Sequence, residues 1–182
     1  DNKHNEETEF RLYYDTYKKD EHKLKVKITR NIYSLEKKEN RYISSVIDLE
    51  SGINTEEKYV DEIIIEPENN YSKVRFDYGM IEVPLPPGAS VQSDLGKIEV
   101  VKVTESGSDE SIEIDQESRL GSLSYKIPIK ELVNKRTFRH IIQFSAKGKY
   151  KLPMTRFFEM YAPDKKAYKG KNNNAVWDLN VN

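Results

Sequence analysis

The sequence contains no cysteine among its 182 residues. Disulfide bonds, thiol nucleophiles and cysteine-ligated zinc sites are therefore excluded for this chain. No apolar run approaches the length of about 18 residues that a membrane-spanning helix needs, so we expect no direct membrane insertion. The chain begins at Asp1 and shows no signal peptide, which indicates either a removed leader or a piece of a longer protein.

An excess of charge of either sign is also missing. The sequence has 30 basic and 31 acidic residues, for a net charge of −1. This balance gives no reason to expect a nucleic acid or an anionic membrane as a partner. Charged residues make up 34% and hydrophobic residues 36% of the chain, so we expect a thin core with one face of many strands in water.

Residue patterns that carry catalysis or bind metals are absent as well. His4, His22 and His140 are the three histidines, and no two of them stand at metal-ligand spacing. No serine-hydrolase elbow, phosphate-binding loop or dinucleotide fingerprint occurs. The acidic segment 105–117 lacks the ordered spacing of a calcium loop. We therefore expect no enzyme, no catalytic residue, no metal and no cofactor.

Short segments with a period of two dominate the chain and predict strands. Apolar residues alternate with charged ones from Leu24, and Tyr59–Ile65 should be a more buried strand. Roughly eight to ten such segments between turn signals predict an all-β, antiparallel β-sandwich of immunoglobulin-like or fibronectin-like architecture with long loops. We expect a flexible end at 1–9 and a single sandwich domain at 10–182.

Three local features refine this prediction. A change of face at Met80-Ile81 predicts a bulge or bend, and residues 130–134 could form one helical turn. Prolines and a glycine from Pro84 to Gly88 should end the strand that precedes them, because proline cannot donate to a ladder.

Two segments resemble bacterial alpha-2-macroglobulins. Residues 80–89, with Pro84-Leu85-Pro86-Pro87-Gly88, are similar to the strand and "PLPAG" element of that family. Residues 138–164 resemble its final stretch, in which an alternating strand, a glycine–tyrosine–proline turn and a "MY-x-P-E" motif follow one another. Here the last motif reads Met160-Tyr161-Ala162-Pro163-Asp164, with aspartate in place of the commoner glutamate.

The resemblance implies a non-catalytic, macroglobulin-like C-terminal domain of an exported protease-trapping protein. In many such proteins, though not in all bacterial ones, a separate domain of the same chain carries an internal thioester, and attack by a target protease exposes it. The C-terminal domain packs on the thioester domain and shields the thioester from water through a Met-Tyr loop. The resemblance places this role on Met160, Tyr161 and Pro163, and implies a location in the periplasm or cell envelope.

Two other readings stay open from the sequence. An unrelated β-sandwich that binds carbohydrate or mediates adhesion would present exposed aromatic residues, for which Tyr13, Tyr14, Tyr17 and Trp177 are candidates. A purely structural domain would instead bury Met160 and Tyr161 within itself, with Tyr161 packed on a neighbouring phenylalanine.

Overall fold

The described part of the chain consists of strands joined by turns. A computed structural model describes residues 24–39, 41–47, 52–68, 78–92, 99–103, 109–114, 119–120, 123–168 and 176–182, so the flexible end expected at 1–9 lies outside it. Within these residues no helix is long and apolar enough to cross a membrane. The strands are β1 (Val26–Lys38), β2 (Arg41–Val46), β3 (Lys58–Pro67), β4 (Gly79–Pro84), β5 (Ala89–Gln92), β6 (Glu99–Val103), β7 (Asp109–Ile112), β8 (Arg119–Leu120), β9 (Ser124–Ile129), β10 (Arg136–Phe144), β11 (Gly148–Pro153), β12 (Arg156–Glu159), β13 (Ala162–Tyr168) and β14 (Val176–Val181).

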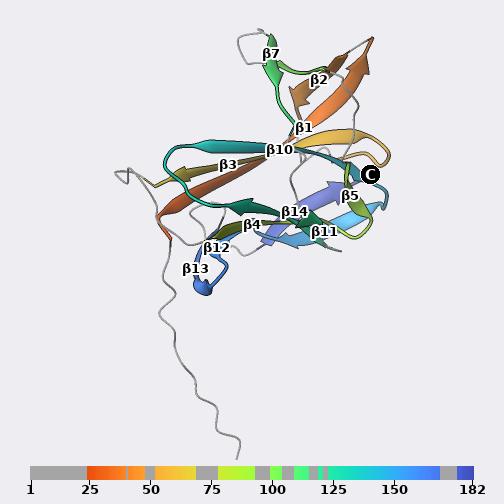
Figure 1. Ribbon diagram of the computed structural model, residues 1–182. Coiled ribbons are helices and arrows are strands. Elements are labelled where there is room, and N and C mark those ends of the chain that lie inside the picture. Colours follow the sequence, from red (N-terminus) through yellow and green to blue (C-terminus); the bar gives the residue numbers. More distant parts are fainter. Residues whose placement is uncertain are drawn as a thin grey trace, which may run out of the picture.

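These strands form three sheets, and the all-β prediction is confirmed. The largest sheet has the order β5-β10-β3-β1-β2-β6-β7, the second β13-β12-β4-β9-β8, and the third pairs β11 with β14. Figure 1 shows β10 and β3 lying above β4 and β12, as in a sandwich. All pairs are antiparallel except β2 and β6, which run parallel, so the antiparallel prediction holds with one exception.

The main core lies between the two larger sheets. Each sheet contributes the inward side chains of its central strands, and the small β11–β14 sheet closes one side through Leu152, Leu179 and Val181. The fully buried large side chains include Phe144 and Phe157. Burial of such side chains contributes about 1.5–3 kcal/mol each relative to exposure.

A second cluster explains why β3 is hydrophobic on both faces. Tyr59 and Ile63 point into the main core, whereas Val60 packs in a separate cluster with Ile141, and with Val100 of β6. Part of the outer face of the large sheet is therefore covered as well. The prediction of a deeply buried Tyr59–Ile65 segment is confirmed.

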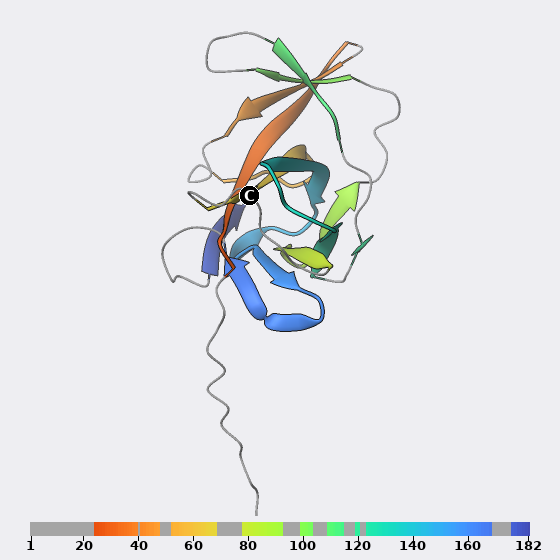
Figure 2. The ribbon, with the colours of Figure 1, turned by 60° about the vertical axis from the view of Figure 1, so that its left-hand side comes forward.

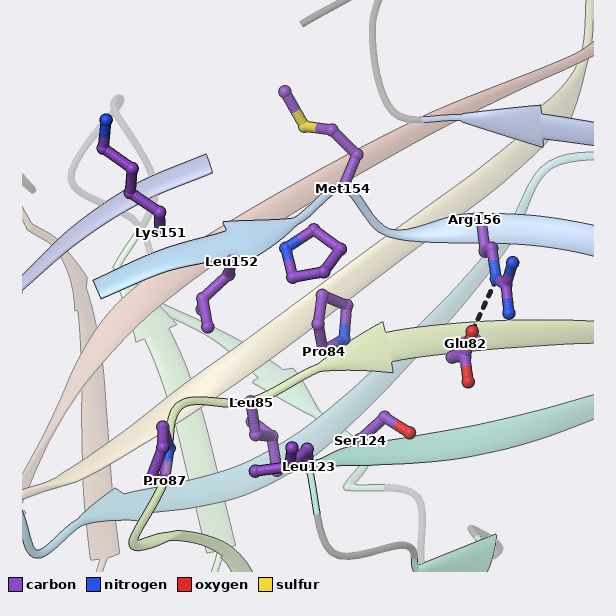
Figure 3. A pocket seen from close by; sticks show the side chains of 11 residues that line it. Glu82, Pro84, Leu85, Pro87, Leu123, Ser124, Lys151, Leu152, Met154 and Arg156 are labelled. Carbon is purple, nitrogen blue, oxygen red and sulfur yellow. Dashed lines mark hydrogen bonds and ion pairs between the residues drawn. The ribbon is translucent and has the colours of Figure 1, made fainter. Parts of the chain in front are cut away.

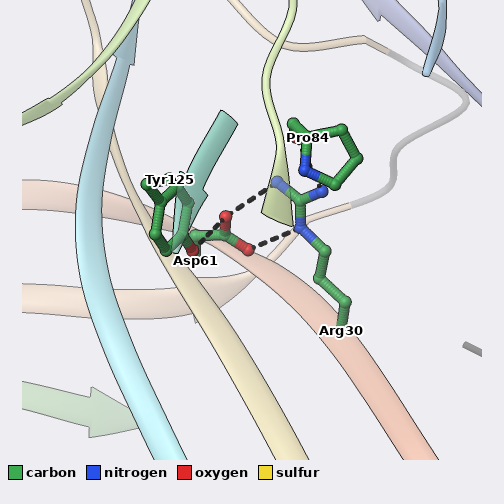
Figure 4. A network of polar contacts seen from close by, with 4 residues as sticks. All are labelled: Arg30, Asp61, Pro84 and Tyr125. Atoms are coloured by element: carbon green, nitrogen blue, oxygen red, sulfur yellow. Dashed lines mark hydrogen bonds and ion pairs between the residues drawn. The ribbon is translucent and has the colours of Figure 1, made fainter. Parts of the chain in front are cut away.

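An ion pair lies inside the main core, where the two sheets face each other (Figure 4). The Arg30 guanidinium donates to both carboxylate oxygens of Asp61 at 2.8 and 2.7 Å and to the Pro84 carbonyl at 3.0 Å. The Tyr125 hydroxyl donates to the same carboxylate at 2.7 Å. Because Arg30 and Asp61 belong to one sheet and Tyr125 and Pro84 to the other, the network joins both layers.

Two local predictions are wrong. Residues 130–134 form no helical turn but a bend with an isolated bridge at Leu132, whose buried side chain anchors the segment. No bulge occurs at Met80-Ile81, because β4 pairs in continuous register with both β12 and β9. Met80 and Ile81 point to opposite faces of this regular strand, and both are buried.

The strand count also exceeds the prediction. Fourteen strands occur in the described residues, rather than eight to ten. One reason is that turns divide segments that read as continuous in the sequence: 152–161, for example, spans the end of β11, all of β12 and the following turn.

Tyr59 supports a stability prediction at high pH. Its hydroxyl accepts a hydrogen bond from the Asn54 amide at 2.8 Å and donates one to Glu57 at 2.9 Å. Burial, and then the Glu57 carboxylate, raise the pKa of Tyr59 from 10.0 to about 12. The folded state thus holds this proton more tightly than the unfolded state.

The stabilisation should therefore be fully present below pH 10 and be lost as the pH rises from 10 towards 12. Urea unfolding at several pH values should show this loss in the unsubstituted chain. Tyr59→Phe lacks the proton and should show a weaker pH dependence in that interval. Equal pH dependence in the two proteins would contradict the assignment.

Candidate functional site

The family-like motif at 160–163 lies at the hairpin between β12 and β13. The β12 strand pairs with β4 on one side and β13 on the other, so it is held from both edges. Phe157, which is fully buried, fixes this strand to the core. Met160 and Tyr161 form the turn that follows, and this hairpin lies at the opposite end of the molecule from β2 (Figures 1 and 2).

A bulge on β13 follows this turn and includes Pro163. Glu159 of β12 pairs with Ala162 of β13, but its neighbour Phe158 pairs with Lys166. Residues 163–165 therefore have no partner in the register. A proline suits this position, because its missing amide hydrogen is not required by a ladder there.

Both residues of the turn are exposed. Tyr161 retains 77% and Met160 41% of its accessible surface. The described ring contact of Tyr161 is with Tyr78, edge to face at 5.8 Å between centroids. Burial of the pair within its own domain, which a purely structural role predicts, is therefore not observed.

Tyr78 belongs to the same surface, and the sequence did not indicate it. It is 58% exposed, and its carbonyl accepts a hydrogen bond from the Met160 amide at 2.9 Å. In a strand with a period of two, Tyr78 would share a face with Met80, which is buried. The one available signal was Gly79, a turn-favouring residue directly after Tyr78.

A groove of about 610 Å³ opens elsewhere, between β4, β9 and β11 (Figure 3). The two family-like segments both line it, through Pro84, Leu85 and Pro87 on one side and Leu152 and Pro153 on the other. At its edge Arg156 pairs with Glu82 at 2.5 Å. This lining is mainly apolar, with Glu82, Lys151 and Arg156 as its charged side chains.

The described residues also lack a cluster of metal ligands. No three His, Asp or Glu side chains there could hold a metal ion together. His140 is 1% exposed on β10, with its ring 4.9 Å from that of Tyr125. The aromatic candidates for a carbohydrate site, Tyr13, Tyr14, Tyr17 and the side chain of Trp177, lie outside the described part.

The chain is similar to bacterial alpha-2-macroglobulins in both sequence and fold. Over 127 residues, or 68% of this chain, the sequence is 32% identical to alpha-2-macroglobulin of Ralstonia nicotianae, of which it spans 8%. The fold is similar to Escherichia coli alpha-2-macroglobulin activated by porcine elastase, with a TM-score of 0.54 and 12% identity. That match covers 86% of this chain and 13% of the other. No protein-family model matches the chain.

A further similar structure contains only the C-terminal part of such a protein. It is native Escherichia coli alpha-2-macroglobulin from domain MG7 to the C-terminus, with a TM-score of 0.51 and 11% identity. The match covers 86% of this chain and 23% of that one. At such identities the structures establish the fold, while the Ralstonia protein provides the sequence relationship. The chain therefore belongs to the bacterial alpha-2-macroglobulin family, as a macroglobulin-like domain of its C-terminal region.

Proposed function

We propose that this chain is the non-catalytic C-terminal domain of a protease-trapping alpha-2-macroglobulin. In this proposal residues 10–182 form one sandwich domain of a larger exported protein in the periplasm or cell envelope. The domain packs on the thioester domain of the same parent chain, and Met160 and Tyr161 cover the thioester. The target protease is an indirect partner, which reacts only after the cover has moved.

The observation that carries this proposal is the exposure of the Met160–Tyr161 turn. A large aromatic side chain that retains 77% of its surface contributes little to its own domain. Its exposure is understandable if another surface covers it, because exposed apolar patches mark interaction sites. Strand β12 is held by ladders on both edges, so the turn is presented from a rigid base.

The chemistry of the two side chains suits a cover over a thioester. A thioester is lost when water attacks it, so its lid must be apolar and close-fitting. The methionine thioether is flexible and fills irregular gaps, while a tyrosine ring adds area and a hydroxyl that can hold the lid by a hydrogen bond. Pro163, in the bulge behind the turn, restricts the backbone through its fixed φ.

The experiment begins with the parent gene. Its reading frame should encode a helical domain with a Cys-x-x-Gln-type motif upstream of this domain. In the purified full-length protein, Tyr161→Ala should increase spontaneous release of the free thiol about tenfold or more, because water reaches the bond. Thiol titration over time measures the rate.

Val46→Ala provides the matched control. Val46 is an apolar side chain with 72% exposure, on β2 at the far end of the molecule, so its truncation should leave the thiol-release rate unchanged. A parent without a thioester domain would contradict the proposal. An unchanged rate in Tyr161→Ala would do the same.

A further inference from the structure

We propose that Tyr78 is a positioning residue that holds the Met160–Tyr161 turn in the orientation required for covering its partner. This inference rests on the proposed function, and it adds a residue from a different strand to the site. Tyr78 precedes β4, far from the turn in the sequence, and the structure brings it to the tip of the β12–β13 hairpin.

Two separate contacts join Tyr78 to the turn. The rings of Tyr78 and Tyr161 meet edge to face, with centroids 5.8 Å apart and planes at 87°, a favoured geometry for aromatic pairs. The Tyr78 carbonyl also accepts the Met160 amide at 2.9 Å. This bond continues the β12–β4 pairing one step beyond Glu159 and Gly79, so both residues of the turn are fixed by Tyr78.

The backbone of Tyr78 indicates that its geometry is imposed by these contacts. Its φ of 52° lies in the left-handed region, which is unfavourable for a residue with a bulky side chain. Such conformations persist where the surroundings determine them, and they concentrate at functional sites. Here the strained residue stands directly beside the proposed cover.

The contact of Tyr78 with the turn differs from a contact in the core, because all three side chains are exposed. Tyr78, Met160 and Tyr161 retain 58%, 41% and 77% of their surface, so their association removes little area from water. Its main effect is to limit the rotation of the Tyr161 side chain before docking. Ordering a side chain in advance improves binding several-fold to about tenfold, and this sets the size of the expected effect.

Two variants distinguish the contribution of the Tyr78 ring from that of the Tyr78 backbone. Tyr78→Asn removes the ring while asparagine tolerates the left-handed conformation, so the hydrogen bond from Met160 should be retained. Tyr78→Phe keeps the ring and should keep the edge-to-face packing. In the 182-residue chain, NMR should show contacts between the ring at position 78 and the ring of Tyr161, both in the unsubstituted protein and in Tyr78→Phe. Tyr78→Asn should leave Tyr161 disordered with the core spectrum unchanged.

In the full-length parent, thiol release measures the consequence. Tyr78→Asn should accelerate it about three- to tenfold, and Tyr78→Phe should change it less than about twofold. The double variant Tyr78→Asn/Tyr161→Ala should release thiol no faster than Tyr161→Ala alone, because Tyr78 acts through Tyr161. Additive effects of the two substitutions would overturn the positioning role.

The two proposals fail in different ways. If Tyr161 is equally ordered in Tyr78→Asn and in the unsubstituted chain, the positioning role is wrong whatever the parent does. If the order is lost while neither Tyr78→Asn nor Tyr161→Ala alters thiol release, or if the parent carries no thioester, the contact is real and the covering function is wrong.

Discussion

Replacing Asp61 with alanine should lower the free energy of unfolding by about 3–5 kcal/mol, because it leaves the buried Arg30 charge without its carboxylate. The side chains of this pair are 1% and 0% exposed, and two hydrogen bonds join them. The same change removes the acceptor of the Tyr125 hydroxyl. Urea unfolding at neutral pH measures the loss.

Two controls make this prediction specific. Glu82→Ala breaks the pairs with Arg156 and Lys126, whose side chains are 44% and 42% exposed, and should cost no more than about 1 kcal/mol. The double replacement Arg30→Met/Asp61→Leu removes both charges and should be markedly more stable than Asp61→Ala. If Asp61→Ala were no more harmful than Glu82→Ala, the buried network would have no special role in stability.

The network also connects the core to the proposed site. Arg30 donates to the carbonyl of Pro84, at the end of β4, and Tyr78 stands directly before the start of the same strand. Tyr125 pairs with Val83 of β4. Loss of Asp61 should therefore loosen β4 and, through it, the surface around Tyr161.

Much of the fold could be predicted because burial leaves a clear pattern in the sequence. The alternation that begins at Leu24 and the isoleucines of 63–65 indicated β1 and β3, since one face or both faces of a strand must be apolar. The parallel pairing of β2 with β6 could not be predicted, because strand order depends on contacts between distant segments. The bend at 130–134 was missed because one buried side chain, Leu132, decided it.

The candidate site, like the fold, could be predicted only in part. Met160, Tyr161 and Pro163 were found through their resemblance to a family motif, and the structure places the first two on an exposed turn. No family motif includes Tyr78. It belongs to the site because of its positive φ and because β4 pairs with β12. Neither feature can be recognised from a local sequence pattern.

Phe157→Ala should destabilise the domain by about 3–5 kcal/mol and also disorder the Tyr161 turn. The side chain of Phe157 is fully buried in the main core, so truncation removes its apolar contacts and leaves a cavity. Its backbone pairs with Ile81 on β4 and Ala167 on β13. The strand that carries the turn thus depends on this ring for its attachment to the core.

Phe158→Ala is the matched control, because it removes the same atoms one residue along the strand. The Phe158 side chain is only partly buried, and the Arg156 guanidinium lies over its ring at 5.0 Å, so a smaller loss of stability is expected. Urea unfolding and the order of the Tyr161 ring by NMR should both distinguish the variants. Equal losses of stability from the two truncations would contradict a special role of the buried Phe157 ring. A loss of stability in Phe157→Ala with Tyr161 still ordered would mean that the contacts of Tyr78 hold the turn without that ring.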